Sequence, residues 1–157
     1  MNTMQPIRFQ CSQQIPRSAV EICSAVADTA SWSSFKGYGI LPGIASAVYE
    51  KRTAQMLGSI IRVQSSDGST YIEEIYQWID GERIAMKFHD FSPPLSSIAT
   101  HFTEEWLLQS ANGGTFVTRS FEMFPRHAGA WPMLWFISQF FRQAIERNLK
   151  EMALIGR

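Results

Sequence analysis

Charge is scarce in this chain, and neither sign dominates. Charged residues make up 18% of the 157 residues, and 14 lysines and arginines balance 14 aspartates and glutamates, so the formal net charge is zero. Soluble domains carry about 25% charged residues on average. Without a net field, nothing in the composition favours nucleic acid, an anionic membrane or an acidic substrate as a partner. We therefore expect no binding to nucleic acid.

Cysteine and long apolar runs are scarce as well. The two cysteines, Cys11 and Cys23, have no C-x-x-C spacing, which predicts reduced, buried thiols in a cytoplasmic protein. Residues 1–10 lack the apolar stretch of a signal peptide. The longest apolar-rich run, residues 131–141, is about half as long as a membrane-spanning helix. We expect no integral membrane span.

Familiar catalytic and metal-binding motifs are missing. The histidines, His89, His101 and His127, share metal-ligand spacing neither with one another nor with a cysteine or carboxylate. Gly37-x-Gly39 lacks the third glycine and the following helix of a dinucleotide fingerprint, and the chain has no P-loop and no G-x-S-x-G elbow. The sequence therefore predicts neither a metal nor a cofactor.

Large apolar side chains, by contrast, are plentiful. Aromatic residues make up 13% of the chain, with 11 Phe and 5 Trp. That is more large apolar surface than a modest core requires, and a lined cavity is one place for it. A chain of this length is the usual size of one domain and can bury a core without a metal or disulfide. With no repeat and no linker, residues 1–157 are interpreted as a single domain.

The hydrophobic period changes along the chain from strands to a terminal helix. Ser18 and Glu21 have capping-box spacing for a short helix that ends near Ala27, and a second short turn follows with Trp32 and Phe35. The predicted strands are residues 6–14, 45–51, 58–65, 71–79, 83–89, 98–109 and 115–122, with hairpin turns at Asp67-Gly68, Asp80-Gly81 and Asn112-Gly113 and a long helix over residues 131–155.

Hairpins joined in series form an antiparallel sheet, and a single long helix must cover its buried face. We therefore expect an α+β fold. It should have a seven-stranded curved antiparallel sheet, two short helices after the first strand and a long C-terminal helix. The sheet and that helix should enclose a mostly apolar cavity.

Several short motifs occur within this order of elements. They are Pro16…Val20-Glu21-Ile22, Asp28-x-x-x-Trp32-x-x-Phe35, Gly58 at the start of a strand, Glu73-Glu74…Asp80, Pro93 and Gly113-Gly114-Thr115. With the terminal helix, they resemble the helix-grip superfamily of START-like, Bet v 1-like and polyketide cyclase/dehydratase-like (SRPBCC) domains. The resemblance implies a central cavity. It implies no single function, because members include lipid carriers, hormone receptors, cyclases and chaperone-ATPase activators.

Strand register predicts that Arg119 points inward. A two-residue Asn112-Gly113 turn places Arg119 opposite Trp106, with Glu104 as its diagonal neighbour on an apolar face. A lone buried charge is costly, so Arg119 should be paired or bound. Two interpretations are open. Arg119 pairs with Glu104 and stacks on Trp106, or it anchors a carboxylate, phosphate or enolate of a ligand.

The neighbouring hairpins predict a second inward acid. Counting from Asp80-Gly81 turns Glu73 and Gln77 inward and Glu74 outward, whereas the family resemblance implies Glu74 as the inward acid. A two-residue Asp67-Gly68 turn places Arg62 opposite Glu73 as a second internal pair. The residues expected to line the cavity are Arg62, Glu73, Gln77, Met86, Phe88, Phe102, Glu104, Trp106, Arg119, Phe121 and Phe141.

The terminal helix has more apolar surface than one cavity needs. From Trp131 to Phe141 it is apolar nearly all round, which is typical of a helix buried on both sides. One side would roof the cavity. For the other, cover by the chain's own loops, a homodimer through the Trp131–Phe141 region and an apolar lid for a lipid-like ligand are all open.

Three functions are compatible with these patterns. The first is binding of an apolar or amphipathic small molecule (lipid, polyketide or aromatic-like) in the cavity between the sheet and the C-terminal helix. The second is a cyclase/dehydratase-like enzyme whose cavity Arg and Glu groups supply an oxyanion partner and a general acid or base. The third is a protein-interaction module that uses the apolar face of the helix. We expect the first, with a hydrophobic small molecule as the partner.

Overall fold

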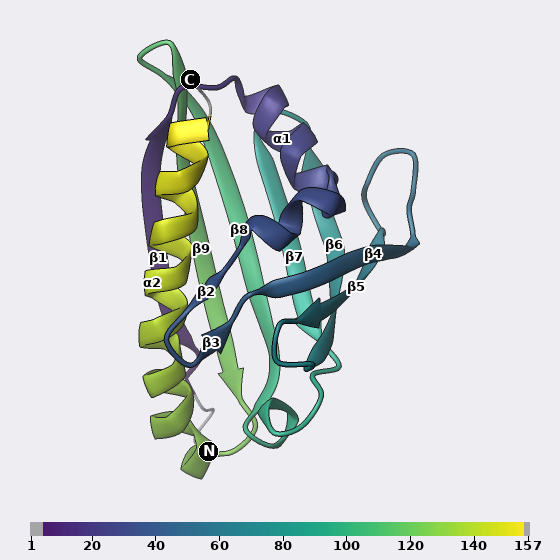
Figure 1. Ribbon diagram of the computed structural model, residues 1–157, viewed down its shortest axis with the longest axis vertical. Helices are drawn as coiled ribbons and strands as arrows, with labels where there is room; N and C mark the ends of the chain where they lie inside the picture. Colours follow the sequence, from purple (N-terminus) through teal and green to yellow (C-terminus); the bar gives the residue numbers. More distant parts are fainter. Residues whose placement is uncertain (1–4, 156–157) are drawn as a thin grey trace.

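A computed structural model describes residues 5–155 of the chain, and seven of its strands form one large antiparallel sheet. The strand order is β1-β9-β8-β7-β6-β5-β4, so the first and last strands pair and the rest follow as a meander (Figure 1). This is the predicted seven-stranded α+β arrangement. The strands are β1 (Ile7–Ile15), β4 (Ile44–Lys51), β5 (Ile60–Ser65), β6 (Thr70–Ile79), β7 (Arg83–His89), β8 (Ala99–Ala111) and β9 (Gly114–Pro125).

Helices and short segments lie against this sheet. The long helix α2 (Trp131–Ile155) has the predicted bounds and runs along β1 (Figure 1). The two predicted short helices are α1 (Ala19–Ala27) and the 3-10 helix η1 (Thr29–Ser34). The remaining elements are β2 (Gly37–Tyr38), β3 (Leu41–Pro42), η2 (Leu95–Ser97) and η3 (Ala128–Ala130). Among the described residues, no helix is long and apolar enough to cross a membrane.

The sequence did not predict the small β2–β3 hairpin, which packs against α2. Gly39 at its tip has a positive φ of +56°, and a Cβ added there would lie 2.4 Å from a ring carbon of Phe140. Only a glycine lets the hairpin tip approach the helix this closely. The hairpin therefore covers part of the apolar surface of α2. Cover by the chain's own loops was one of the alternatives that the sequence left open.

The β8–β9 hairpin has the predicted two-residue turn. Asn112 and Gly113 both adopt positive φ, 51° and 79°, as a type I′ turn requires. Ala111 consequently pairs with Gly114, and Arg119 lies opposite Trp106. The predicted register of this hairpin is confirmed.

The β5–β6 hairpin differs from the prediction by one residue. Ser65 donates its backbone N–H to Ser69 O over 2.8 Å, so residues 66–68 form the loop and Gly68 has φ +89°. This is a three-residue hairpin loop that ends in a left-handed glycine. A one-residue change reverses every side chain. Arg62 lies opposite Ile72, and Ile61, not Arg62, faces Glu73. The predicted internal Arg62–Glu73 pair is wrong.

The β6–β7 hairpin departs from the predicted register twice, and beyond the second departure the predicted register is restored. Its loop is residues 80–82, one longer than predicted, because Ile79 pairs with Arg83. A β-bulge between Ile75 and Gln77 then shifts the register back, so Glu73 lies opposite Phe88, as predicted. Between the bulge and the turn the faces are exchanged. Gln77 pairs with Ala85, and the prediction that it points inward is wrong.

Candidate functional site

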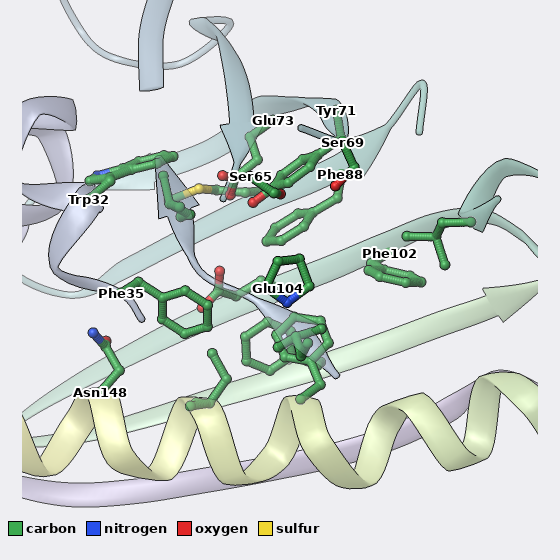
Figure 2. A pocket seen from close by; sticks show the side chains of 18 of the residues that line it. Trp32, Phe35, Ser65, Ser69, Tyr71, Glu73, Phe88, Phe102, Glu104 and Asn148 are labelled. Carbon is green, nitrogen blue, oxygen red and sulfur yellow. The ribbon is translucent and has the colours of Figure 1, made fainter. Parts of the chain in front are cut away.

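A cavity of about 920 Å³ lies between the sheet and α2, and its wall is mainly apolar. The inner faces of β6 to β9 form its floor. On the other sides it is bounded by α2, η1, the β2–β3 hairpin and the η2 region, each of which contributes lining residues. Figure 2 shows Trp32, Phe35, Phe88 and Phe102 around this space. Protein interiors leave few voids larger than a water molecule. A space of this size is therefore a distinct feature of the fold and not a packing defect.

Most of the predicted cavity residues lie on this wall. The rings of Phe121 and Phe141 pack in a tilted arrangement with centroids 4.8 Å apart, and the centroids of Phe88 and Phe102 lie 6.3 Å apart. Arg62 and Gln77 are outside the wall, for the register reasons given above; Arg62 forms an ion pair with Glu50 on the outer face. The predicted residues on the wall are Glu73, Met86, Phe88, Phe102, Glu104, Trp106, Arg119, Phe121 and Phe141.

Arg119 is held by a closed set of contacts on the cavity floor. Its Nε donates to Glu104 Oε2 over 2.6 Å, and its Nη1 donates to Asn148 Oδ1 over 3.0 Å. The guanidinium carbon lies 4.1 Å from the centroid of the Trp106 ring. The Glu104 and Arg119 side chains are only 3% and 9% exposed. Of the two interpretations of Arg119, the structure therefore shows the internal pair.

Burial and charge act in opposite directions on Glu104. Desolvation raises the pKa of its carboxyl, while the adjacent Arg119 guanidinium opposes that rise. Asn148 completes the set and was not predicted from the sequence. The helical spacing could have indicated it, because Phe141, Ile145, Asn148 and Met152 form one inward stripe of α2. All four residues line the cavity.

Glu73 is the second inward acid, and it has no such partner. It is 4% exposed, and within the described residues no side chain or backbone group hydrogen-bonds its carboxyl. Burial raises the pKa of Glu73 well above its ordinary value, and the negative charge of Glu104 adds to the rise. Burial in the cavity wall therefore favours the protonated, neutral form of the Glu73 carboxyl. Glu74 points to the opposite face, where its Oε2 lies 3.3 Å from His89 Nε2.

The hydroxyl groups of Tyr71 and Ser65 are among those that share the cavity wall with Glu73. Tyr71 stands two residues before it on β6, and Ser65 ends the inward row of β5. The Tyr71 ring stacks on Phe88 with centroids 5.6 Å apart. Figure 2 shows Ser65, Tyr71 and Glu73 together on the wall away from α2, with Glu104 between them and Asn148. Sequence counting missed Ser65 because it assigned the wrong loop length to the β5–β6 turn.

The cavity reaches the surface beside the N-terminal half of α2. Ile40 and Met133 line the cavity and are nevertheless 61% and 53% exposed, which marks an apolar mouth. Trp135 and Phe136 on the same helix are also about half exposed, at 47% and 48%. The homodimer through the Trp131–Phe141 region stays a prediction.

Among residues 5–155, no group of three or more His, Cys, Asp or Glu side chains is arranged to hold a metal ion. Both cysteines are free and buried.

The sequence matches a known family model over residues 6–154, almost its entire length. That family is described as polyketide cyclase/dehydrase and lipid transport. The chain belongs to this family. Its membership agrees with the helix-grip resemblance seen in the sequence motifs. The comparison with curated proteins finds no match.

Solved structures with the same fold come from distant relatives. A Streptomyces protein, the Zhui aromatase/cyclase, superposes with a TM-score of 0.73 at 12% identity, covering 96% of this chain and 93% of that one. A START superfamily protein from Mycobacterium smegmatis gives 0.67 at 13% identity, covering 92% and 98%. The structure of Ara h 8.0201 gives 0.64 at 15% identity, covering 93% and 99%. At these identities the likeness shows the helix-grip fold alone.

Proposed function

We propose that this protein binds an apolar or amphipathic small molecule, such as a lipid, a polyketide or an aromatic compound, in the cavity between the sheet and α2. The cavity itself carries the proposal. Its volume of about 920 Å³ lies at the upper end of the range for small-molecule sites, about 300–1,000 Å³. A site of this kind is typically apolar with a few placed polar groups. Here the aromatic rings supply the apolar wall, and Glu73 and Arg119 supply the polar groups.

The family supports the same proposal. Its description joins the cyclisation of polyketides with lipid transport, and both activities require a space for a largely apolar molecule. The apolar mouth at Ile40 and Met133 offers such a molecule a route that avoids crossing charged surface.

Titration with the uncharged fluorescent probe N-phenyl-1-naphthylamine tests the proposal. The wild-type protein should bind it with saturable fluorescence enhancement. Ile137→Trp should abolish this signal, because Ile137 points from α2 into the cavity and an indole there would occupy the space. Gln139→Trp is the matched control, since Gln139 lies on the exposed face of the same helix. Equal binding by all three proteins would place the probe elsewhere and contradict the proposal.

One observation favours a cyclase/dehydratase-like enzyme as a second candidate. A carboxyl whose pKa is raised by burial in an aromatic cavity can act as a general acid toward a bound carbonyl. Proton–deuterium exchange at the α-carbons of 2-tridecanone in D2O would reveal such polarisation. The enzyme hypothesis predicts faster exchange with wild type than with Glu73→Gln. Exchange at the solvent rate, with the ketone bound, would leave binding as the function.

A further inference from the structure

Two sets of polar groups on the cavity wall differ in whether their hydrogen bonds are already made. The closed set is Arg119, Glu104 and Asn148, which bind one another at 2.6 and 3.0 Å. The open set is Glu73 and Tyr71 on β6 and Ser65 on β5, farther from α2 than Glu104 (Figure 2). A ligand inside the cavity can gain hydrogen bonds from the open set without breaking any.

The closed set leaves Arg119 unavailable as a free cation for a ligand. A ligand carboxylate that approached Arg119 would have to displace Glu104, which is 3% exposed and would then be buried without its partner. The cavity wall contains two other basic side chains, the exposed Lys36 and the half-buried Arg17. Lys36 is exposed and donates to Ser33 O over 3.0 Å, and Arg17 lies 3.9 Å from Glu21.

The open set offers hydrogen-bond donors without positive charge. A protonated carboxyl carries one O–H donor and keeps acceptor capacity, and Tyr and Ser hydroxyls donate as well. Within the described residues, the Glu73 carboxyl and the Tyr71 hydroxyl make no hydrogen bond. Buried polar groups are nearly always paired. A buried carboxyl that the fold leaves unpaired, and aims into a cavity, is placed for a group that arrives with the ligand.

We propose that Glu73, with Tyr71 and Ser65, selects an uncharged ligand by donating a hydrogen bond to its carbonyl, ester or hydroxyl oxygen, and that free carboxylates are rejected. This inference rests on the proposed small-molecule function and specifies the class of molecule. The apolar part of the ligand lies against the aromatic wall, and its oxygen lies at the open set. Glu73 is thereby a specificity-determining residue.

Displacement of N-phenyl-1-naphthylamine by matched twelve- and thirteen-carbon amphiphiles tests this selection near pH 7.5. The competitors are 2-tridecanone, methyl laurate, laurate and dodecylamine, all below their micelle concentrations. The ketone and the ester should displace the probe at concentrations at least about tenfold below laurate, the factor expected for one buried hydrogen bond made or left unmade.

Variants of Glu73 identify the group responsible. Glu73→Leu, which removes a buried polar group and fills the same space, should lose the tenfold preference while still binding the probe. Glu73→Gln keeps an N–H donor and should retain the preference for the ketone. Glu74→Leu is the matched control, since the neighbouring side chain is on the outer face and 45% exposed. It should behave as wild type.

The pH dependence gives a second readout. Three titratable groups act at this site: Tyr71 on β6, Glu104 on β8 and Arg119 on β9. The neighbouring strands and α2 contribute Ser65 from β5, Met86 and Phe88 from β7 and Asn148, and the cavity wall also carries the charged side chains Arg17, Lys36 and Asp67. Because 2-tridecanone does not titrate, its affinity should fall at high pH in wild type, as Glu73 ionises, and should stay level in Glu73→Gln.

Two results in wild type would overturn the inference. Tighter binding of laurate than of the ketone would show a free cation in the cavity. Tighter binding of dodecylamine than of the ketone would show an ionised Glu73. Equal affinities for all four competitors would overturn it as well. These failures are distinguishable from failure of the proposed function, in which neither the probe nor any competitor binds.

Discussion

Arg119 donates through Nε to Glu104 Oε2 over 2.6 Å, and both side chains are buried on the cavity floor. Removing one partner leaves the other charge buried and uncompensated, which costs about 3–5 kcal/mol. Arg119→Met and Glu104→Leu should each lower the free energy of unfolding by about that amount. The double variant should recover most of the loss, because no charge is left unpaired.

Urea denaturation of the four proteins in a double-mutant cycle measures this coupling. A double variant that loses the sum of the two single losses would show that the residues act independently.

The unpaired Glu73 should make stability depend on pH. The folded-state pKa of Glu73 is raised, so the folded protein holds this proton more tightly than the unfolded chain does. Its contribution is fully present below the unfolded pKa, about 4.3, and is lost as pH rises toward the folded value at about 1.4 kcal/mol per pH unit. Glu73→Gln has no proton to lose. Its advantage over wild type should grow with pH from about 5 upward.

Denaturation curves at several pH values test this expectation, with Glu74→Gln as the control because that carboxyl is on the outer face. A constant difference between wild type and Glu73→Gln across the whole range would mean that Glu73 is ionised in the folded protein.

The β2–β3 hairpin should control how fast a ligand leaves the cavity. An alanine at Gly39 would strain a positive φ and bring a methyl group within 2.4 Å of the Phe140 ring, so the hairpin should lift from α2. Ile40 and Leu41 on the hairpin line the cavity. We therefore expect Gly39→Ala to raise the dissociation rate of N-phenyl-1-naphthylamine in stopped-flow experiments severalfold.

Gly113→Ala separates this effect from simple backbone strain. Gly113 has a similar left-handed φ, +79°, and a Cβ there meets nothing within 4 Å. An equal rise in dissociation rate in both variants would contradict a role for hairpin contact.

Much of the architecture could be predicted from periodicity and turn chemistry. The bounds of α2, the seven strands and the Arg119–Trp106 register follow from local patterns that the folded chain also uses. Asn112-Gly113 was decisive, because this dipeptide favours positive φ at both positions and thus defines a two-residue turn. The prediction that Arg119 points inward used this register together with the apolar face that Arg119 shares.

The inward positions of Arg62 and Gln77 were predicted wrongly because a turn dipeptide alone does not determine the length of the hairpin loop. Asp67-Gly68 suits both a two-residue turn and a three-residue loop, and the choice moved Arg62 to the outer face. The bulge near Tyr76 likewise moved Gln77, since a bulge leaves little local signal. Whether a buried acid is paired also depends on distant strands, so the contrast between Glu104 and Glu73 emerged only from the three-dimensional arrangement.

Native mass spectrometry tests the central claim, a cavity that holds an apolar or amphipathic molecule, most directly. Wild-type protein incubated with 2-tridecanone should show the mass of a one-to-one complex, and Ile137→Trp should show the polypeptide alone. Wild-type protein that appears only at its polypeptide mass, under conditions that preserve the fold, would contradict the account.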